Sequence, residues 1–277
     1  MKEFTVENQI TLKEFTDTTY PQGSFFWNYL LKNREIKVNG KKVGADQTLY
    51  AGDRVAYYLT PERERKAAYH VVYEDENVLI VDKESGVNSE AVYADLCRSE
   101  REACYFIHRL DRNTSGLLAF AKTEQAETEL KNAFRDRRVE KIYHALCFGL
   151  FTRENEVLTA YLKKNADRST VRIYDTPQTG AEKIITEYQV LERAKGYTVV
   201  EVTLHTGKTH QIRAHLAHIG CPIAGDNKYG DTAENAKAKL TRQRLVAKKL
   251  TFAFDGGVLA YLNGKSFLSR FEAKGDV

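Results

Sequence analysis

The sequence predicts an α+β fold in which strands outnumber helices. From about Tyr69 onward, short apolar runs of strand length alternate with turns, and only two stretches have a clear long helical periodicity. Of 277 residues, 42% are hydrophobic and 29% are charged, as in ordinary packed proteins. The first 60 or so residues differ in texture and end in a charge run at 61–66. We therefore predict a small module over 1–62, a linker over 63–70 and a larger domain over 71–277.

The N-terminal module is predicted to contain a short helix and a hairpin. Bulky apolar side chains at 24–31 suit a short packed helix. Asn39 and Gly40 lie between two short β-branched stretches, and both residues tolerate a positive φ. This pair predicts a tight hairpin turn. A second turn at 51–53 leads into the final strand of the module.

Strands and two helices are predicted in the larger domain. Thr123 can cap a helix whose apolar residues recur at helical spacing, and Glu127 with Lys131 forms an i,i+4 pair on it. A second helix is predicted from about Thr209, with Gly220 as its C-terminal stop. The predicted strands are 78–82, 116–122, 141–149, 184–192 and 197–205.

Charge, cysteine content and hydropathy limit the class of protein. The 42 basic and 38 acidic residues leave a net charge of +4, which permits a polyanionic partner without requiring one. The four cysteines include no C-x-x-C pair, which fits a reducing compartment. No run approaches the roughly 20 apolar residues of a membrane span, and the N-terminus lacks a signal-peptide pattern. We expect a cytoplasmic monomer with no membrane partner.

Three polar stretches are candidates for chemistry. They cover 108–116 (HRLDRNTSG), 141–145 (KIYHA) and 204–215 (LHTGKTHQIRAH). Each alone has an ordinary explanation, since the first is good turn sequence and the second is an amphipathic strand whose tyrosine can simply pack.

The third stretch raises the hypothesis of a metal site, because four histidines lie within 14 residues. On a helix, His210 and His215 are five positions apart and point in different directions, whereas a helical zinc pair sits at i and i+4. Gln211 shares a face with His215 and His218, but two histidines and a glutamine are a poor zinc set. We predict no metal. The sequence also lacks the glycine-rich phosphate-binding motifs, so no nucleotide cofactor is expected.

In order and spacing, the three stretches together resemble the RluA-type family of pseudouridine synthases. The signature H-R-L-D-x-x-T-S-G matches 108–116 without a mismatch. The block L-x-T-G-[RK]-x-H-Q-[IL]-R, followed by H-x-x-x-x-G-x-P-I-x-G-D-x-x-Y-G, runs over 204–230. The resemblance extends from about Val71 to the C-terminus and implies a mixed, mostly antiparallel sheet with a central catalytic cleft. It implies isomerisation of uridine to pseudouridine in ribosomal RNA or tRNA, with no cofactor.

The resemblance also implies roles for individual residues. Asp111 would be the catalytic carboxylate, which traps the sugar or base covalently or assists proton removal. Arg213 would pair with Asp111 and favour its ionised form, and Tyr143 would pack against the target base. These three are the predicted catalytic residues. The predicted substrate-binding residues are Arg109, which helps hold the flipped nucleotide, Ile212, which forms an apolar floor, and Arg112, Lys208, His210 and Gln211.

The N-terminal module more loosely resembles the S-four-type RNA-binding module, through 38–41 and 51–53. The opening helix of that module is predicted to be absent or degenerate, because the polar stretch 16–19 lies in its place. The sequence also departs from the catalytic family's pattern at two places. Lys208 stands where arginine is commoner, and the turn at 84–86 lacks the usual proline.

Two other classes remain as hypotheses. One is a non-catalytic RNA-binding or ribosome-assembly factor on the same scaffold, and the other is a metal-dependent hydrolase built on the histidines. Basic residues expected to contact RNA are Lys41, Lys42, Arg112, Lys208, Arg135, Arg137 and Arg138.

Overall fold

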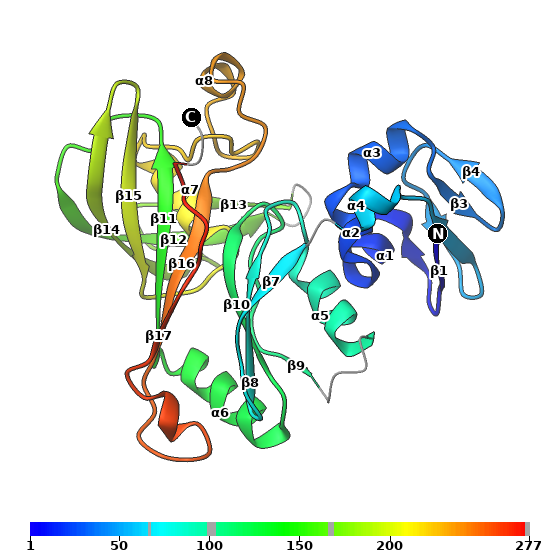
Figure 1. The fold of residues 1–277 in the computed structure, drawn as a ribbon. Helices are drawn as coiled ribbons and strands as arrows, with labels where there is room; N and C mark the ends of the chain where they lie inside the picture. Colours follow the sequence, from blue (N-terminus) through cyan, green and yellow to red (C-terminus); the bar gives the residue numbers. More distant parts are fainter. Residues whose placement is uncertain (66–67, 99–103, 166–168, 275–277) are drawn as a thin grey trace.

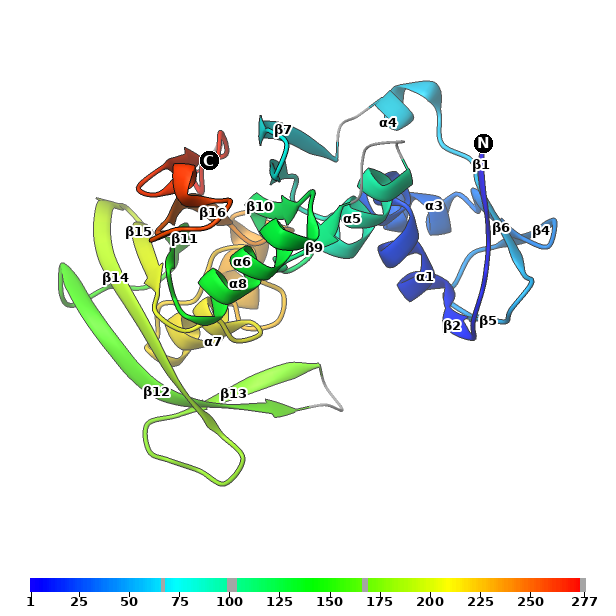
Figure 2. The same ribbon diagram turned by 90° about the horizontal axis from the view of Figure 1, so that it is seen from below.

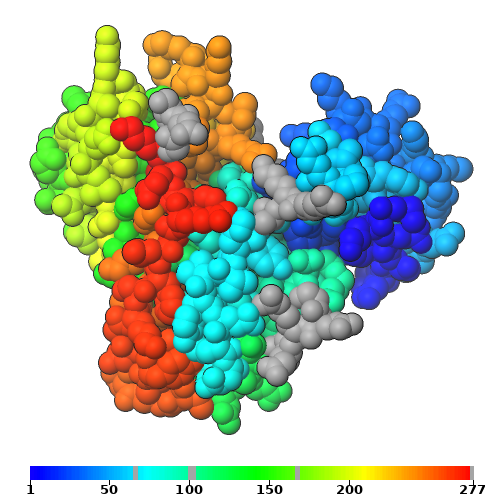
Figure 3. Space-filling view, viewed as in Figure 1, coloured from blue at the N-terminus to red at the C-terminus, as the bar shows by residue number. Residues whose placement is uncertain are grey.

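The computed structural model describes residues 1–65, 68–98, 104–165 and 169–274, and these residues form two bodies (Figure 1). The smaller N-terminal body lies beside α5 (Ser89–Arg98), and the strands β14 and β15 lie at the opposite end of the molecule (Figures 1 and 2). A space-filling view shows a notch between the blue N-terminal body and the orange segment that contains α8 (Figure 3).

The N-terminal body is built on a four-stranded antiparallel sheet with the order β1-β6-β3-β4. The predicted hairpin is confirmed, with Asn39 at φ 49° and Gly40 at φ 80°. The predicted helix at 24–31 forms as two short helices, α2 and α3. The elements are β1 (Lys2–Thr5), β2 (Ile10–Thr11), α1 (Leu12–Thr19), α2 (Pro21–Phe25), α3 (Trp27–Lys32), β3 (Ile36–Val38), β4 (Lys41–Val43), β5 (Thr48–Leu49) and β6 (Arg54–Tyr57).

The prediction that the opening helix is absent or degenerate is wrong, because α1 is a regular helix. The side chain of Thr11 caps it by accepting a hydrogen bond from the Glu14 amide. The Thr16 and Thr18 hydroxyls donate to carbonyls of the preceding turn, so these polar side chains are accommodated within the helix. Leu12 is fully buried in the apolar core of the N-terminal body.

The larger body contains an 11-stranded sheet, with the order β13-β12-β14-β15-β11-β16-β10-β8-β7 and with β17 and β9 attached to β16 and β10. Its pairs are antiparallel except for β10 with β16, which confirms the predicted mixed, mostly antiparallel sheet. The strands are β7 (Tyr69–Glu74), β8 (Val78–Lys83), β9 (Tyr105–Phe106), β10 (Ser115–Ala121), β11 (Val139–Cys147), β12 (Asn155–Asn165), β13 (Thr170–Tyr174), β14 (Glu182–Ala194), β15 (Tyr197–Leu204), β16 (Leu245–Phe252) and β17 (Ser266–Leu268).

Helices cover parts of this sheet. Thr123 caps α6 as predicted, and the Glu127–Lys131 pair is present at 2.6 Å. The expectation of only two long helices missed α5, whose buried face combines Val92 and Leu96 with the small Ser89 and Ala91. The helices beyond the N-terminal body are α4 (Pro61–Arg65), α5, α6 (Glu124–Arg135), α7 (Gln211–His218), α8 (Thr232–Lys237) and the 3₁₀ turn η1 (Ala260–Leu262).

The predicted linker over 63–70 overlaps regular structure at both ends. Its start falls in α4 and its end in β7, and its residues 66–67 lie outside the described residues. Buried apolar residues of α6 pack with those of β8 and β10, while residues of α7 pack with those of β11 and β15. The β10–β16 pair joins these two halves of the sheet, and the segment 108–114 enters β10 at this junction.

Candidate active site

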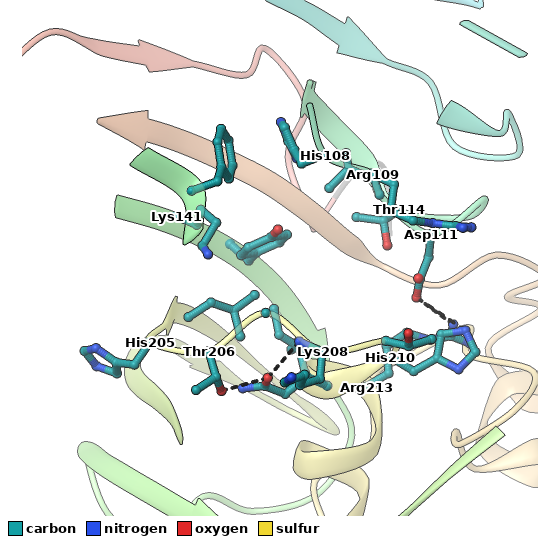
Figure 4. A pocket seen from close by; sticks show the side chains of 18 of the residues that line it. His108, Arg109, Asp111, Thr114, Lys141, His205, Thr206, Lys208, His210 and Arg213 are labelled. Atoms are coloured by element: carbon teal, nitrogen blue, oxygen red, sulfur yellow. Dashed lines mark hydrogen bonds and ion pairs between the residues drawn. The ribbon is translucent and has the colours of Figure 1, made fainter. Parts of the chain in front are cut away.

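A cavity of about 690 Å³ lies where the three predicted motifs meet (Figure 4). The segment 108–111 before β10 lines one side, and the loop and helix start at 204–213 line the other. Lys141 of β11 lies between them, and Tyr143 of the same strand also lines the cavity. The fold thus closes the separation of 102 positions between Asp111 of the first motif and Arg213 of the third.

Asp111 and Arg213 form an ion pair in the cavity. The Arg213 Nη1 donates to Asp111 Oδ2 at 2.8 Å. Asp111 begins a turn in which the Thr114 amide donates a hydrogen bond to the Asp111 carbonyl, at 3.0 Å. Arg213 lies in the first turn of α7 and is 7% exposed. The predicted pairing of these two residues is therefore present in the structure.

A second carboxylate holds the other edge of the Arg213 guanidinium. Asp226 accepts from Nε at 2.7 Å and from Nη2 at 2.9 Å, and its Oδ1 also accepts from the amides of Lys228 and Tyr229. Burial alone would lower the pKa of Arg213, but hydrogen bonds and charge from Asp226 and Asp111 outweigh it and raise that pKa. Asp226 lies within the third motif, yet sequence reasoning gave it no role.

Tyr143 lines the same cavity as this pair. A register shift between Ile142 and Tyr143 where β11 pairs with β16 changes the strand's local geometry at this residue. Burial, followed by the charge of Asp111, raises the pKa of Tyr143. Its phenol is therefore protonated at neutral pH and can donate a hydrogen bond. Ile212, which is 4% exposed, adds apolar surface to the same cavity.

His210 lies close to Asp111 but is neutral. It sits in the left-handed region at φ 54°, with Nδ1 2.9 Å from the Tyr229 hydroxyl and Nε2 3.9 Å from Asp111 Oδ2. Burial lowers the pKa of His210 more than the nearby Asp111 carboxylate raises it. At neutral pH this contact is therefore not an ion pair, and a neutral imidazole faces the carboxylate.

Gln211 supports the cavity wall. It is 2% exposed, accepts from the Thr206 hydroxyl at 2.9 Å and the Lys208 amide at 3.1 Å, and donates to Ile185 and Thr186. The first two contacts hold the loop before α7, and the last two tie it to β14. Lys208, predicted to meet phosphate, forms an ion pair with Glu182 at the cavity wall.

Arg109 lines the cavity, whereas Arg112 does not. Arg109 is largely exposed, and its Nη1 lies 3.0 Å from Glu90 Oε1. Arg112 was predicted to bind substrate together with Arg109, but it is not among the residues that line the cavity, and its guanidinium binds Asp17 of α1 and the Ser24 carbonyl of α2. Arg112 follows Asp111 directly, but the turn directs its side chain toward the N-terminal body.

The four clustered histidines have separate partners. His205 contacts Glu187, His215 contacts the buried Thr186 hydroxyl, and His218 contacts Asp175. Among the described residues, no group of three or more His, Cys, Asp or Glu side chains is arranged to hold a metal ion. In the same part of the chain, no helix has the length and apolar character needed to cross a membrane.

Three basic residues near the cavity were given no role from the sequence. Lys83 is fully buried, and its Nζ donates to the carbonyls of Val87, Glu84 and Arg112; burial lowers its pKa to about 7. His108 is half-buried, accepts a hydrogen bond from the Ala119 amide and stacks on Phe134. Lys141 points into the cavity (Figure 4).

Comparison with known protein families gives a match over residues 68–218 to the RNA pseudouridylate synthase family. Ribosomal large subunit pseudouridine synthase C of Vibrio cholerae is 34% identical over 229 residues, which cover 73% of this chain and 70% of that protein. Ribosomal large subunit pseudouridine synthase D of Pseudomonas aeruginosa is 30% identical over 222 residues, which cover 72% of this chain and 67% of that protein.

Solved structures show the same architecture. Human RNA pseudouridylate synthase domain containing 1 superposes with a TM-score of 0.58 at 26% identity, covering 68% of this chain and 79% of that chain. Human RNA pseudouridylate synthase domain containing 4 gives a TM-score of 0.60 at 21% identity, covering 73% and 88%, which supports the fold. With the motifs gathered around one cavity, these matches show that the chain belongs to the RluA-type family of RNA pseudouridine synthases and is an isomerase.

Proposed function

We propose that this enzyme converts uridine to pseudouridine in large-subunit ribosomal RNA and that Asp111 is its catalytic carboxylate. The observation that carries the proposal is the 2.8 Å pair between Asp111 and Arg213, beside Tyr143 in one cavity. The choice of RNA rests on the relatives from V. cholerae and P. aeruginosa, which are named for the large ribosomal subunit.

The reaction is an isomerisation and needs groups that handle charge and protons. The bond between ribose C1′ and uracil N1 breaks, a bond from C1′ to uracil C5 forms, and a proton leaves C5 while another is gained at N1. Attack by the Asp111 carboxylate would split this change into two easier steps. Arg213 would keep that carboxylate ionised and oriented, and Asp226 would in turn orient Arg213.

Tyr143 and Ile212 would hold the uracil between them. Aromatic and apolar surfaces support a base that has left its stack, which costs a few kcal/mol per base. A protonated Tyr143 hydroxyl could donate to the turned uracil. Arg109, exposed at the cavity wall, would brace the opened RNA, because a guanidinium can stack on a base and bind phosphate. Lys208 would contact phosphate, with His210 and Gln211 shaping the loop.

The two bodies would have separate functions, RNA binding and catalysis. We propose that residues 1–62 form an RNA-binding module and residues 71–277 form the catalytic domain. Lys41 and Lys42 of the β3–β4 hairpin are exposed, which makes their charges available to phosphate.

The test compares Asp111→Asn with the wild type on unmodified RNA transcripts. Large-subunit ribosomal RNA and a pool of tRNAs are incubated with each protein, and pseudouridine is measured by nucleoside mass spectrometry and mapped along the RNA. We expect product in large-subunit RNA with wild type and at least a 10³-fold slower rate with Asp111→Asn, as for loss of a catalytic group.

Asp255→Asn is the matched control, since Asp255 is an exposed carboxylate outside the cavity, and its activity should equal the wild type. Full activity of Asp111→Asn would refute the assigned role of Asp111. Product only in tRNA would refute the assigned RNA. RNA binding by wild type without product from any RNA would favour the non-catalytic RNA-binding factor.

A further inference from the structure

A buried ion pair joins the N-terminal body to the turn that carries Asp111. Arg112 Nη1 donates to both carboxylate oxygens of Asp17, at 2.7 and 2.9 Å, and Nη2 donates to the Ser24 carbonyl. The Asp17 side chain is only 10% exposed and the Arg112 side chain 26%. The two terminal nitrogens of Arg112 thus have separate acceptors, the Asp17 carboxylate and the Ser24 carbonyl, which fixes the guanidinium in both position and orientation.

The backbone of Arg112 is fixed as well. Its carbonyl accepts hydrogen bonds from the Gly86 amide at 2.8 Å and from Lys83 Nζ at 3.2 Å. With the side chain held by Asp17, the residue directly after Asp111 has little freedom. Displacing Arg112 would therefore displace the Asp111 backbone.

The residue directly before Asp111 is fixed through the same interface. Ser24 of α2 accepts a hydrogen bond from the Asn88 amide, at the start of α5. The next residue, Ser89, exchanges hydrogen bonds with the amide and the carbonyl of Leu110, at 3.0 and 3.1 Å. The Ser24 hydroxyl also donates to Asp17, which links the two contacts.

Apolar packing accompanies these polar contacts. Phe25 of α2 is 8% exposed and belongs to the same core cluster as Leu110. Helix α1 packs along α5, as Figures 1 and 2 both show. The N-terminal body is thus docked on the elements that flank Asp111.

We propose that Asp17 is a positioning residue for catalysis, which fixes the Asp111 turn from the N-terminal body through Arg112. This inference rests on the proposed role of Asp111. It gives residues 1–62 a function inside the catalytic domain in addition to any contact with RNA. A shift of even about 1 Å in a reacting group can slow an enzyme about a hundredfold, so the strength of this anchor matters for rate.

The test combines kinetics with hydrogen exchange on the full chain. Asp17→Asn keeps the shape of the side chain but removes its charge, and Glu14→Gln, an exposed residue on the same helix, is the matched control. We expect Asp17→Asn to lower kcat about tenfold while KM changes less than about twofold, together with faster amide exchange over 110–116. Glu14→Gln should change neither, and Asp17→Glu should restore most of kcat.

Two further variants keep the inference testable if Asp17→Asn folds poorly. Arg112→Gln should reproduce the same kcat loss and exchange, and the double variant, which removes both charges of the Asp17–Arg112 pair, should be no slower than either single variant. Unchanged exchange over 110–116 in folded Asp17→Asn would overturn the inference, as would a change confined to KM. Because exchange is measured without substrate, this result is distinguishable from a failure of the proposed function, which would appear as an inactive wild type.

Discussion

At the scale of single residues, Arg213 depends on two carboxylates with different tasks. Asp111 faces the cavity, whereas the Asp226 side chain is fully buried and binds Nε and Nη2. We predict that Asp226→Asn destabilises the protein by about 3–5 kcal/mol, because it leaves a buried cation with only one partner. It should also lower kcat, since Arg213 loses the carboxylate that orients its Nε and Nη2 edge. Urea denaturation and steady-state kinetics measure the two effects, and an unfolding midpoint equal to the wild type would contradict the prediction.

The stability of the fold is expected to depend on pH through His108 and His215. Burial lowers the pKa of His108 from 6.5 to about 3, and burial also lowers the pKa of His215 to about 4. Between these values and 6.5 the unfolded chain binds more protons than the folded chain. The free energy of unfolding therefore falls as pH drops below about 6.5, by up to about 1.4 kcal/mol per pH unit for each group.

We predict that His108→Gln, which removes one of these titrating groups, reduces that slope between pH 6.5 and 5. Urea denaturation at a series of pH values is the measurement. A variant whose stability falls with pH as steeply as the wild type would show that His108 is not one of the groups responsible.

At the scale of elements, the parallel pair of β10 and β16 requires a glycine. Gly116 has φ +111°, and a Cβ there would lie 2.3 Å from the Ala247 carbonyl oxygen. Gly196 also has a positive φ, +90°, but a Cβ there would meet nothing within 4 Å. We predict that Gly196→Ala costs about 1–2 kcal/mol from backbone strain alone, and that Gly116→Ala costs about 1–3 kcal/mol more from the clash. Thermal unfolding of both variants separates the two causes, and equal losses would mean that the strand relaxes around the added methyl.

Much of the element pattern could be predicted from local sequence, but the contacts between elements could not. The helix cap at Thr123 and the turn at Asn39 and Gly40 depend only on residues nearby in the chain, so both were predictable. Helix α1 was missed because its polar residue Asp17 is paired with Arg112, which lies 95 positions away in the sequence. The direction of the Arg112 side chain depends on the same docking, so its position next to Asp111 suggested the wrong partner. Asp226 stood in a motif, but nothing local showed that it would share Arg213 with Asp111.

At the scale of the whole molecule, the net charge of +4 hides an uneven distribution. The C-terminal end of α6 and the segment after it bring Arg135 and Arg137 to the cavity, and Lys141 lines it too. The acidic residues of α6 have other tasks: Glu127 pairs with Lys131, and Glu129 accepts hydrogen bonds from backbone amides near η1. A nearly balanced sequence can therefore present a basic cavity to an RNA strand.

Within this cavity Lys141 lacks an anionic partner among the described residues, although neighbouring Lys208 has Glu182. Burial, together with the charge of Arg137, lowers the pKa of Lys141, so an RNA phosphate bound nearby would offset that cost. We predict that Lys141→Met weakens RNA binding and reduces the slope of log Kd against log salt by about one. Lys237→Met, on exposed α8 and outside the cavity, should leave that slope unchanged. Binding titrations at several salt concentrations make the comparison. Equal slopes for Lys141→Met and the wild type would mean that no phosphate occupies this end of the cavity.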